Sequence, residues 1–531
     1  MALTVSNPLI AALLGAQAYP HPVQTPRLVE THISWVILTG TYAYKIKKPL
    51  NLGFLDFSTL AKRRHFCEEE LRVNRFFAPQ LYVDVVAICA TDSGPRVAAA
   101  TGEVLEYAVR MLQFPDGALL AERPERIAMT VWRQLGEDVA RVHAGLPARR
   151  EDEPGSCGTP VALRDAIAEN FRQIRPYLRD RAEILELNRL EEQAWSACRA
   201  HEKLLWQRHA QGRVRECHGD LHLGNIALIE GRAIPFDALE FNPSLRWIDV
   251  LNEMAFLVMD CRSRGQQPAA FAALNAYLEV SGDYSGLALL DFFCSYRAVV
   301  RAKVSLLAVL APVTSGSEAH RAYLRYSALA AAYQQPRHRF LAICCGVSGS
   351  GKSTLAELLA AQAGAVRIRA DVERKRLFGL EPDADSHGAG VDIYTAEAGR
   401  RTFARLAELA AGIIGDGFAV IVDATFIKRE LRADFRRLAR ELGVPFHILL
   451  CDAPVEELRR RVRARLERGT DASEADTSVL ETQLRTAELP DPRSEPETLR
   501  VDAIDPGSVA QLAARLDPDT AGPGSAISSE H

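Results

Sequence analysis

The sequence has 531 residues, of which 48% are hydrophobic and 25% are charged, and its formal net charge at pH 7 is −4. This near-neutral charge argues against a dedicated nucleic-acid binder and against a protein held on a membrane by electrostatic attraction. No apolar run reaches the roughly 18 residues that a bilayer-spanning helix needs. The 10 cysteines form no C-x-x-C pair, which indicates reduced thiols and therefore a cytoplasmic protein. The length predicts about two or three domains.

The apolar run at residues 9–18 predicts a first helix, and strands are predicted next at residues 32–38 and 42–48, joined by a tight turn. Lys45 follows an alternation of apolar residues in the second strand. The strand lysine of a protein kinase, which contacts the α- and β-phosphates, follows the same pattern. From this segment alone, a solvent-facing lysine on an edge strand is an equally good interpretation.

A charged helix is predicted next, at residues 60–77. It carries consecutive glutamates that could pair with Lys45, namely Glu68, Glu69 and Glu70. Such a run usually forms a solvated helix face, and we prefer Glu70 because its neighbours place it beside an apolar edge. Strands are predicted at residues 81–89 and 104–111, followed by a loop where a kinase hinge would meet adenine.

The second informative stretch follows a mainly helical region and spans residues 217–226, with the sequence Cys-His-Gly-Asp-Leu-His-Leu-Gly-Asn-Ile. Phosphoryl transfer needs a carboxylate that accepts the substrate hydroxyl proton, an amide that binds Mg²⁺, and a second carboxylate that bridges metal to phosphate. Asp220, Asn225 and Asp237 have the order and spacing of these groups in protein kinases. The pattern therefore predicts a phosphoryl-transfer loop.

Alternative interpretations of this stretch stay open. His218 and His222 are spaced like zinc ligands on a helix, but Gly219 and Gly224 favour a loop, and no third ligand is evident. An ordinary turn rich in Asp and Asn is the other alternative. It does not explain why the catalytic carboxylate, the amide and the second carboxylate occur together.

The His-Gly-Asp motif with Asn225 and Asp237 resembles the aminoglycoside phosphotransferase and choline kinase-like branch of the protein-kinase fold, over roughly residues 30–310. The resemblance implies that Asp220 is the catalytic base and that Asn225 and Asp237 are Mg²⁺ ligands. It also implies that Asp249 is the buried aspartate that braces the catalytic loop. The sequence departs from the family pattern at Leu223, where many relatives have proline, and at Glu240, one residue beyond the common D-x-E spacing.

A P-loop is predicted at residues 346–353, Gly-Val-Ser-Gly-Ser-Gly-Lys-Ser, between an apolar strand and a helix-forming run. Glycines allow backbone N–H groups to surround phosphate oxygens, and the positive end of the helix dipole faces the same charge. We expect Lys352 to reach the β- and γ-phosphates as a catalytic residue and Ser353 to hold Mg²⁺. The predicted nucleotide contacts are Gly346, Val347, Ser348, Gly349, Ser350, Gly351, Lys352, Ser353 and Thr354.

Strands predicted at residues 365–369, 418–422 and 446–451 alternate with helices, which indicates a parallel α/β sheet. Asp371 and Asp423 follow the ends of two of these strands, where ligands bind in such sheets. We assign Asp423 to Mg²⁺ and Asp371 to the proton of the substrate hydroxyl. Either residue could instead cap the helix that follows it.

Arginines crowd one predicted helix after the fourth strand, namely Arg459, Arg460, Arg461, Arg463, Arg465 and Arg468. Nearby glutamates and the absence of interleaved aromatic residues argue against a nucleic-acid surface. A lid that closes over the γ-phosphate fits better, and part of the cluster must be solvated surface. The P-loop, both aspartates and this helix resemble P-loop kinases of the zeta-toxin and polynucleotide 5′-kinase type. Phe426 stands where polynucleotide kinases tend to have asparagine.

The expected domains are a kinase-like domain at residues 1–335 (lobes at about 25–111 and 115–335), a P-loop domain at 336–512 and a disordered tail at 513–531. This two-lobed kinase-like fold followed by a P-loop α/β sheet resembles bacterial fusion proteins that join an aminoglycoside phosphotransferase-like domain to a P-loop ATP-binding domain. A general AAA ATPase label suits the P-loop, although we find no ring-ATPase arginine finger.

We expect an ATP-dependent kinase with Mg²⁺ at two sites that phosphorylates hydroxyls of small molecules, with no membrane partner and little reason to expect nucleic acid. Two alternatives stay open: one half is a nucleotide- or ligand-sensing module that regulates the other, or the P-loop half is an ATPase that acts on a protein partner.

Overall fold

The computed structural model describes residues 7–53, 55–149, 157–307, 316–382, 384, 386, 392–468, 476–501 and 504–517. The chain divides into two compact units. Unit 1 comprises Met1–Ile127, Val142–Ser263 and Phe292–Ala331, and unit 2 comprises Ala128–Arg141, Arg264–Asp291 and Ala332–His531. The sequence-based domain limits stay predictions, but the expected disordered tail does not begin at residue 513, because a helix continues to Leu516, which is buried. Residues 518–531 of that tail lie outside the described residues.

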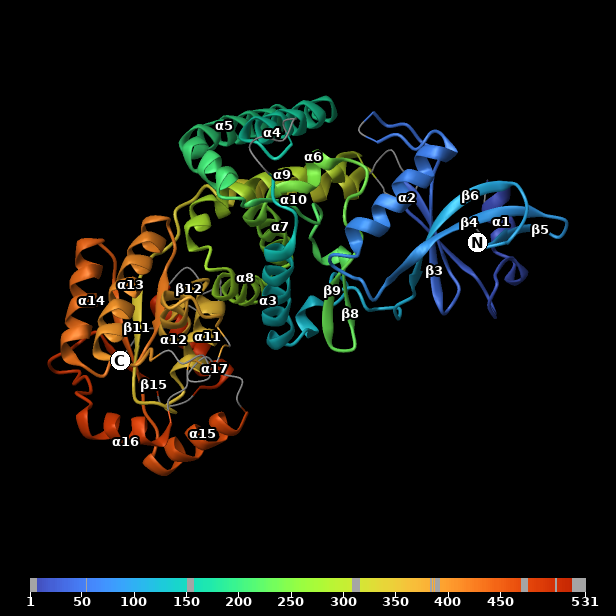
Figure 1. Ribbon diagram of the computed structural model, residues 1–531. Coiled ribbons are helices and arrows are strands. Elements are labelled where there is room, and N and C mark those ends of the chain that lie inside the picture. The colour runs from blue at the N-terminus through green and yellow to red at the C-terminus, as the bar shows by residue number, and fades with distance from the viewer. Residues whose placement is uncertain are drawn as a thin grey trace. The chain divides into compact units, whose positions relative to one another are not determined.

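Unit 1 begins with a six-stranded antiparallel sheet in the order β1-β2-β3-β6-β4-β5. Helix α2 (Leu60–Asn74) lies beside β4 and β6 (Figure 1). The strands are β1 (Arg27–Glu30), β2 (Ser34–Leu38), β3 (Tyr42–Lys47), β4 (Tyr82–Thr91), β5 (Gly94–Val97) and β6 (Val104–Leu112).

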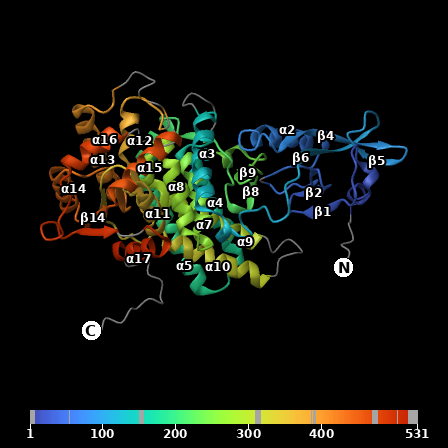
Figure 2. The same ribbon diagram turned by 90° about the horizontal axis from the view of Figure 1, so that it is seen from below.

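Alternation along β3 explains the position of its lysines. Tyr44 and Ile46 point into an apolar core that also contains residues of the short helix α1 (Pro8–Leu13). Because successive side chains point to opposite faces of a strand, Lys45 and Lys47 share the other face. Figure 2 shows α2 beside β4 and β6 from a second direction.

The rest of unit 1 is mainly helical, with two short strand pairs near the predicted catalytic loop. The hairpin β8 (Ile226–Ile229) and β9 (Arg232–Pro235) follows the loop, and β7 (Val214–Glu216) pairs with β10 (Trp247–Asp249). The helices are α4 (Pro160–Ile174), α5 (Arg181–Ala210), α6 (Pro243–Arg246), α7 (Val250–Ser263), α9 (Leu290–Leu307) and α10 (Gly316–Ala332). Helix α3 (Met129–Gly145) is divided between the two units, and the first residues of α9 belong to unit 2.

Unit 2 contains a five-stranded parallel sheet in the order β12-β13-β11-β14-β15. Its strands are β11 (Leu341–Cys345), β12 (Val366–Arg369), β13 (Val420–Asp423), β14 (Phe446–Cys451) and β15 (Thr498–Val501). Its helices are α8 (Gln267–Ser281), α11 (Lys352–Ala363), α12 (Ala370–Leu377), α13 (Ala396–Gly415), α14 (Arg429–Glu441), α15 (Val455–Arg468), α16 (Thr477–Thr486) and α17 (Pro506–Leu516).

The core of unit 2 explains why β11 is apolar at every position. All five residues of this strand are buried. Ala342 and Cys344 pack in one cluster with Leu355 and Leu359 of α11 and with Leu512 of α17. A parallel strand buried on both faces is expected to be continuously apolar. Together, the antiparallel sheet and helices of unit 1 and the parallel sheet of unit 2 confirm the predicted kinase-like fold followed by a P-loop α/β sheet.

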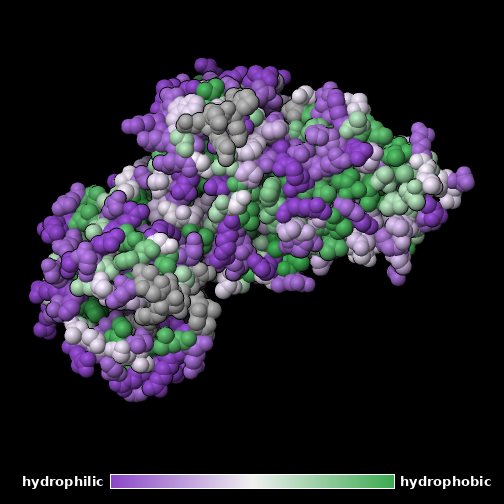
Figure 3. Space-filling view, in the orientation of Figure 1, coloured by the Kyte–Doolittle hydropathy of each residue, from purple (hydrophilic) through white to green (hydrophobic). Residues whose placement is uncertain are grey.

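The face of the molecule that Figure 3 shows carries many hydrophilic residues with hydrophobic patches among them. No helix within the described residues is long and apolar enough to cross a membrane.

Candidate active sites

Lys45 lies at the centre of the first candidate site. Its Nζ is 2.8 Å from Oε1 of Glu70 and also forms an ion pair with Asp237. Glu70 is fully buried, whereas Glu68 pairs with Arg64 at the surface. The pairing expected between Lys45 and Glu70 is therefore present, and a lysine on an edge strand facing solvent is excluded. Its role in nucleotide binding stays a prediction.

Lys47 extends this charge network. Its Nζ is 2.8 Å from Oε2 of Glu70 and is ion-paired with Glu240. Sequence reasoning considered Lys45 alone, although the alternation of β3 places Lys45 and Lys47 on one face. Glu240, which lies one residue beyond the common D-x-E spacing, is 4% exposed and forms an ion pair with Lys47.

The ionisation of this network follows from its charges. Burial alone raises the pKa of Glu70, but Lys45 and Lys47 lower it by more, to about 2. Burial alone lowers the pKa of Lys45, but Asp237 and Glu70 raise it well above its ordinary value. Glu70 and Lys45 are therefore both charged at neutral pH.

The predicted catalytic loop brings Asp220 and Asn225 together. The Asn225 side-chain amide donates hydrogen bonds to the Asp220 backbone oxygen at 3.1 Å and to Oδ2 of Asp220 at 3.0 Å. The backbone N–H of Phe236 donates to the carbonyl of Asn225 at 2.9 Å, so the hairpin returns the chain to the loop.

Asp237 follows the hairpin in an uncommon backbone conformation. Its φ is 64°, in the left-handed region that residues other than glycine rarely adopt. The hydroxyl of Tyr82 accepts a hydrogen bond from the Asp237 backbone N–H at 3.0 Å. This conformation is compatible with the ion pair to Lys45. Backbone strain of this kind concentrates at functional sites.

Both histidines of the loop make hydrogen bonds that maintain its shape. Nε2 of His218 is 2.8 Å from the carbonyl oxygen of Phe236, and Nδ1 of His222 accepts the backbone N–H of Gly224 at 3.0 Å. Nε2 of His222 is 3.4 Å from Oδ2 of Asp220. These contacts use the ring nitrogens that a zinc site would need.

The carboxylate that braces the loop is Glu253 of α7, so the expectation for Asp249 was wrong. Glu253 accepts the backbone N–H groups of His218 at 2.7 Å and Gly219 at 2.8 Å. Asp249 instead forms a bidentate ion pair with Arg208, with N–O distances of 2.7 and 2.8 Å. Sequence reasoning chose the aspartate by resemblance and overlooked a glutamate one helical turn further on.

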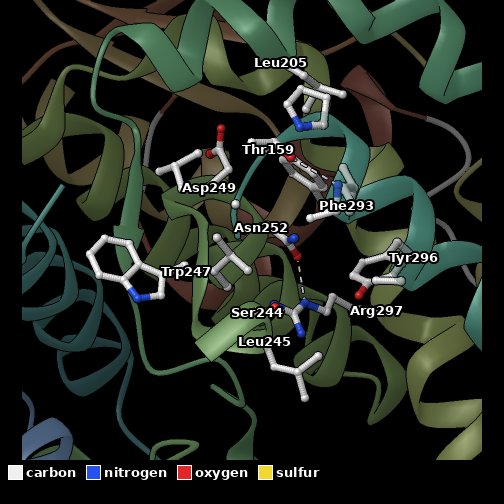
Figure 4. Close-up of a pocket in the computed structure, with 17 residues that line it drawn as sticks. Thr159, Leu205, Ser244, Leu245, Trp247, Asp249, Asn252, Phe293, Tyr296 and Arg297 are labelled. Carbon is white, nitrogen blue, oxygen red and sulfur yellow. Dashed lines mark hydrogen bonds between the residues drawn. The ribbon is translucent and has the colours of Figure 1, made fainter. Parts of the chain in front are cut away.

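A pocket that is partly open to solvent is lined by residues of α4, α7 and α9 and by the segment around β10 (Figure 4). Arg297 lines it and donates a hydrogen bond from Nε to Oδ1 of Asn252 at 2.7 Å. Its Nη1 donates to the carbonyl of Gly219 at 3.2 Å. This arginine therefore connects the pocket wall to the backbone beside Asp220.

The second candidate site is the P-loop of unit 2. Gly346 and Gly349 have φ values of 147° and 82°, in the region that favours glycine. A Cβ at Gly346 would lie 2.3 Å from the carbonyl oxygen of Cys451, and one at Gly349 would lie 2.9 Å from that of Leu458. The loop conformation therefore requires these glycines.

Lys352 and Ser353 begin α11 directly after the loop. Nζ of Lys352 donates to the carbonyl of Val347 at 2.7 Å, so this side chain folds back across the loop. The Ser353 hydroxyl donates to Oδ1 of Asp423 at 3.2 Å. Burial lowers the pKa of Lys352 and raises that of Asp423. A partner of opposite charge would therefore stabilise the charged form of each group.

Asp371 and the arginines of α15 make contacts that the sequence did not predict individually. Asp371 lies at the start of α12 and pairs with Arg374 at 2.8 Å. On α15, Nη1 of Arg461 is 3.4 Å from the carbonyl of Gly349 in the P-loop. Arg461 also pairs with Glu457, and Arg459 and Arg460 pair with neighbouring glutamates. The side chain of Arg468 lies outside the described residues.

The residues of both sites suit magnesium and ATP. Mg²⁺ prefers oxygen ligands, and Asn225 with Asp237 in one site, and Ser353 with Asp423 in the other, offer them. The hydroxyl oxygen of Ser350 in the P-loop is buried without a hydrogen-bond partner among the described residues. A bound phosphate would provide an acceptor for this hydroxyl.

The fold and the sites define a protein that joins a phosphotransferase domain to a P-loop domain. The phosphotransferase enzyme family matches residues 55–290, and an AAA domain family matches residues 341–490. The chain is 31% identical over 467 residues to the uncharacterized protein Rv2004c of Mycobacterium tuberculosis, covering 85% of this chain and 89% of that protein. The chain therefore belongs to the family of two-domain proteins that includes Rv2004c.

Solved structures are similar to parts of the chain. A gluconokinase from Sinorhizobium meliloti is 26% identical, with 34% of this chain and 96% of the gluconokinase covered and a TM-score of 0.25. The amicoumacin kinase hAmiN, solved in complex with AMP-PNP, Ca²⁺ and Ami, is 14% identical, with 58% of this chain and 88% of the kinase covered and a TM-score of 0.38.

Proposed function

We propose that this protein is an ATP-dependent phosphotransferase with two Mg-ATP sites, each of which transfers the γ-phosphoryl group to a hydroxyl of a small molecule. The observation that carries the proposal is that both sets of polar residues are complete. Lys45, Asp220, Asn225 and Asp237 are present in unit 1, and Lys352, Ser353 and Asp423 are present in unit 2. The membership in the phosphotransferase enzyme family supports ATP as the phosphoryl donor.

In the first site, Asp220 is the group that accepts the proton of the acceptor hydroxyl. Lys45 binds the phosphates of ATP and is held in position by Glu70, which is 2.8 Å away. Asn225 and Asp237 would hold Mg²⁺, which neutralises the charge that develops on the phosphates. Bound phosphate and Mg²⁺ would replace the ion pair between Lys45 and Asp237. Catalysis depends on positioning and electrostatic stabilisation.

In the second site, the P-loop backbone surrounds the phosphates and Lys352 turns from the carbonyl of Val347 to the β- and γ-phosphates. Ser353 and Asp423 would hold Mg²⁺. Arg461 approaches the loop from α15 and stabilises the transferring group. Asp371, near the end of β12, accepts the proton of the second acceptor hydroxyl once its ion pair with Arg374 opens.

The test measures transfer of radiolabelled γ-phosphate from ATP to pooled metabolites by the full-length protein, its Asp220→Ala variant and its Lys352→Ala variant. We expect each substitution to remove a separate, acceptor-dependent part of the labelled product. If Asp220→Ala leaves every labelled product unchanged, the first site is not a phosphotransferase site. If ATP is consumed with no labelled metabolite and a protein stimulates its consumption, the P-loop site is an ATPase that acts on that protein.

A further inference from the structure

Helix α8 belongs to unit 2, although its residues precede the P-loop domain that the sequence predicts. It lies within residues 55–290, which match the phosphotransferase enzyme family. In the structure it packs against α11, the helix that begins at the P-loop lysine, and against β12. A segment of the phosphotransferase family region is therefore part of the P-loop unit.

Asn275 of α8 covers the open edge of the parallel sheet. Within the part of the chain that the structure describes, β12 is an edge strand whose pairing partner is β13. On its other side, the Asn275 side-chain amide donates to the carbonyl of Ala365 at 3.0 Å, and its oxygen accepts the backbone N–H of Arg367 at 2.8 Å. One amide group thus satisfies a donor and an acceptor that an edge strand otherwise leaves unpaired.

Glu279 lies one helical turn beyond Asn275 and contacts two arginines of β12. Arg367 is 2% exposed, and its Nε donates to Oε1 of Glu279 at 2.8 Å. Nη1 of Arg369 is 3.7 Å from Oε2 of Glu279, and Nε of Arg369 is 3.8 Å from Oδ2 of Asp423. Asp423 also accepts the hydroxyl of Ser353 through its other oxygen. A continuous series of charges therefore joins α8 to Asp423.

We propose that Glu279 is a positioning residue for the second nucleotide site, which restrains Arg369 and so keeps the Asp423 carboxylate oriented and available for Mg²⁺. The proposal rests on the proposed role of Asp423 as a Mg²⁺ ligand. Without Glu279, Arg369 has one fewer carboxylate to pair with and moves closer to Asp423. A guanidinium bound tightly to that carboxylate competes with the metal. Residues that hold metal ligands through hydrogen bonds or charge typically change metal affinity about 10-fold to 100-fold when replaced.

The test uses the full-length protein carrying Lys45→Met, so that the first site contributes little to nucleotide binding. Binding of fluorescent methylanthraniloyl-ATP is measured during titration with MgCl₂ and, separately, with excess EDTA. We expect Glu279→Gln to raise the Mg²⁺ concentration for half-maximal binding about 10-fold, with metal-free nucleotide affinity unchanged within about twofold. Adding Arg369→Gln to Glu279→Gln should largely reverse this rise, because the competing guanidinium is gone.

Asn275→Ala is the matched control, because it removes the edge cap from the same helix without removing Glu279. It should lower the thermal unfolding temperature and leave the half-maximal Mg²⁺ concentration unchanged. If Glu279→Gln does not fold, Glu279→Asp keeps the buried charge beside Arg367 but withdraws it from Arg369, and a smaller rise of the same sign is expected.

Separate outcomes overturn the two claims. An unchanged Mg²⁺ requirement in the folded Glu279 variant, or a rise that Arg369→Gln does not reverse, contradicts the positioning role. An unchanged Mg²⁺ requirement in Asp423→Asn instead contradicts the proposed function of Asp423, whatever Glu279→Gln does.

Discussion

The ammonium group of Lys45 on β3 is ion-paired with the carboxylate of Asp237, which follows β9. The same ammonium is 2.8 Å from Glu70 on α2. A strand, a helix and the end of a hairpin thus meet at one lysine within unit 1. In this arrangement the residue proposed to bind phosphate and the residue proposed to bind metal neutralise each other.

Lys47→Met should destabilise unit 1 strongly, because it removes the partner of the buried Glu240 and one partner of Glu70. Breaking a buried ion pair from one side typically costs about 3–5 kcal/mol. Urea denaturation followed by tryptophan fluorescence measures the change. The double variant Lys47→Met with Glu240→Gln should recover part of the loss, since it leaves no uncompensated charge at residue 240. A loss below about 1 kcal/mol in the single variant contradicts this account of Lys47.

Glu253→Gln should destabilise the catalytic loop by about 3 kcal/mol, because an amide offers one oxygen to the two backbone N–H groups that the carboxylate accepts. Hydrogen exchange at His218 and Gly219, together with urea denaturation, tests this expectation. Glu68→Gln is the control, since the Glu68 side chain is 51% exposed and pairs with an exposed arginine. It should change stability by less than about 0.5 kcal/mol. Equal effects of the two substitutions would mean that Glu253 does not brace the loop.

The pH dependence of the first site follows from the surroundings of Asp220. Burial alone raises the pKa of this carboxyl group, but His222 and Arg301 lower it by more, so the pKa lies below its ordinary value. A base acts in its ionised form, and a lowered pKa keeps Asp220 ionised as the pH falls. Asp220-dependent kcat/KM should therefore fall by less than half between about pH 7 and pH 5.

His222→Gln removes the largest influence that lowers this pKa. The acid limb of the same profile should therefore move to higher pH. A wild-type acid limb above about pH 5, or a His222→Gln limb displaced to lower pH, would be incompatible with the proposed environment of Asp220.

Arg461→Ala should lower Lys352-dependent phosphoryl transfer at least about 10-fold, because this guanidinium approaches the P-loop carbonyl of Gly349. Arg460→Ala is a matched control from the same helix. The Arg460 side chain is 71% exposed and pairs with Glu457, so its removal should leave the rate within about twofold of wild type. Steady-state rates with saturating ATP distinguish the two variants. Similar rates for both variants would argue against a lid role for Arg461.

The sequence predicted the elements that carry strong local patterns. Apolar alternation predicted β2 and β3, and the glycine spacing with its flanking strand and helix predicted the P-loop. The edge strands β1, β5 and β15 were not predicted. Strand β1 reads Arg-Leu-Val-Glu and has no buried residue, so it lacks the alternation that reveals a strand with one buried face.

Relationships between distant segments were harder to predict. Lys47 could have been found, since it lies two residues after Lys45 on the same strand face. Glu253 was missed because a resemblance to an aspartate directed attention to Asp249. The contacts of Asn275 and Glu279 with β12 depend on how α8 packs, and no local pattern records a pairing with residues about 90 positions away. The assigned roles of the site residues stay predictions.

The central claim is that one chain holds two nucleotide sites, and isothermal titration calorimetry with Mg²⁺ and a non-hydrolysable ATP analogue tests it most directly. The wild-type protein should bind two analogue molecules per chain. Lys45→Met and Lys352→Ala should each bind one, and the double variant should bind none at the same concentrations. A wild-type stoichiometry of one, or an unchanged stoichiometry in the folded Lys45→Met variant, would contradict the claim.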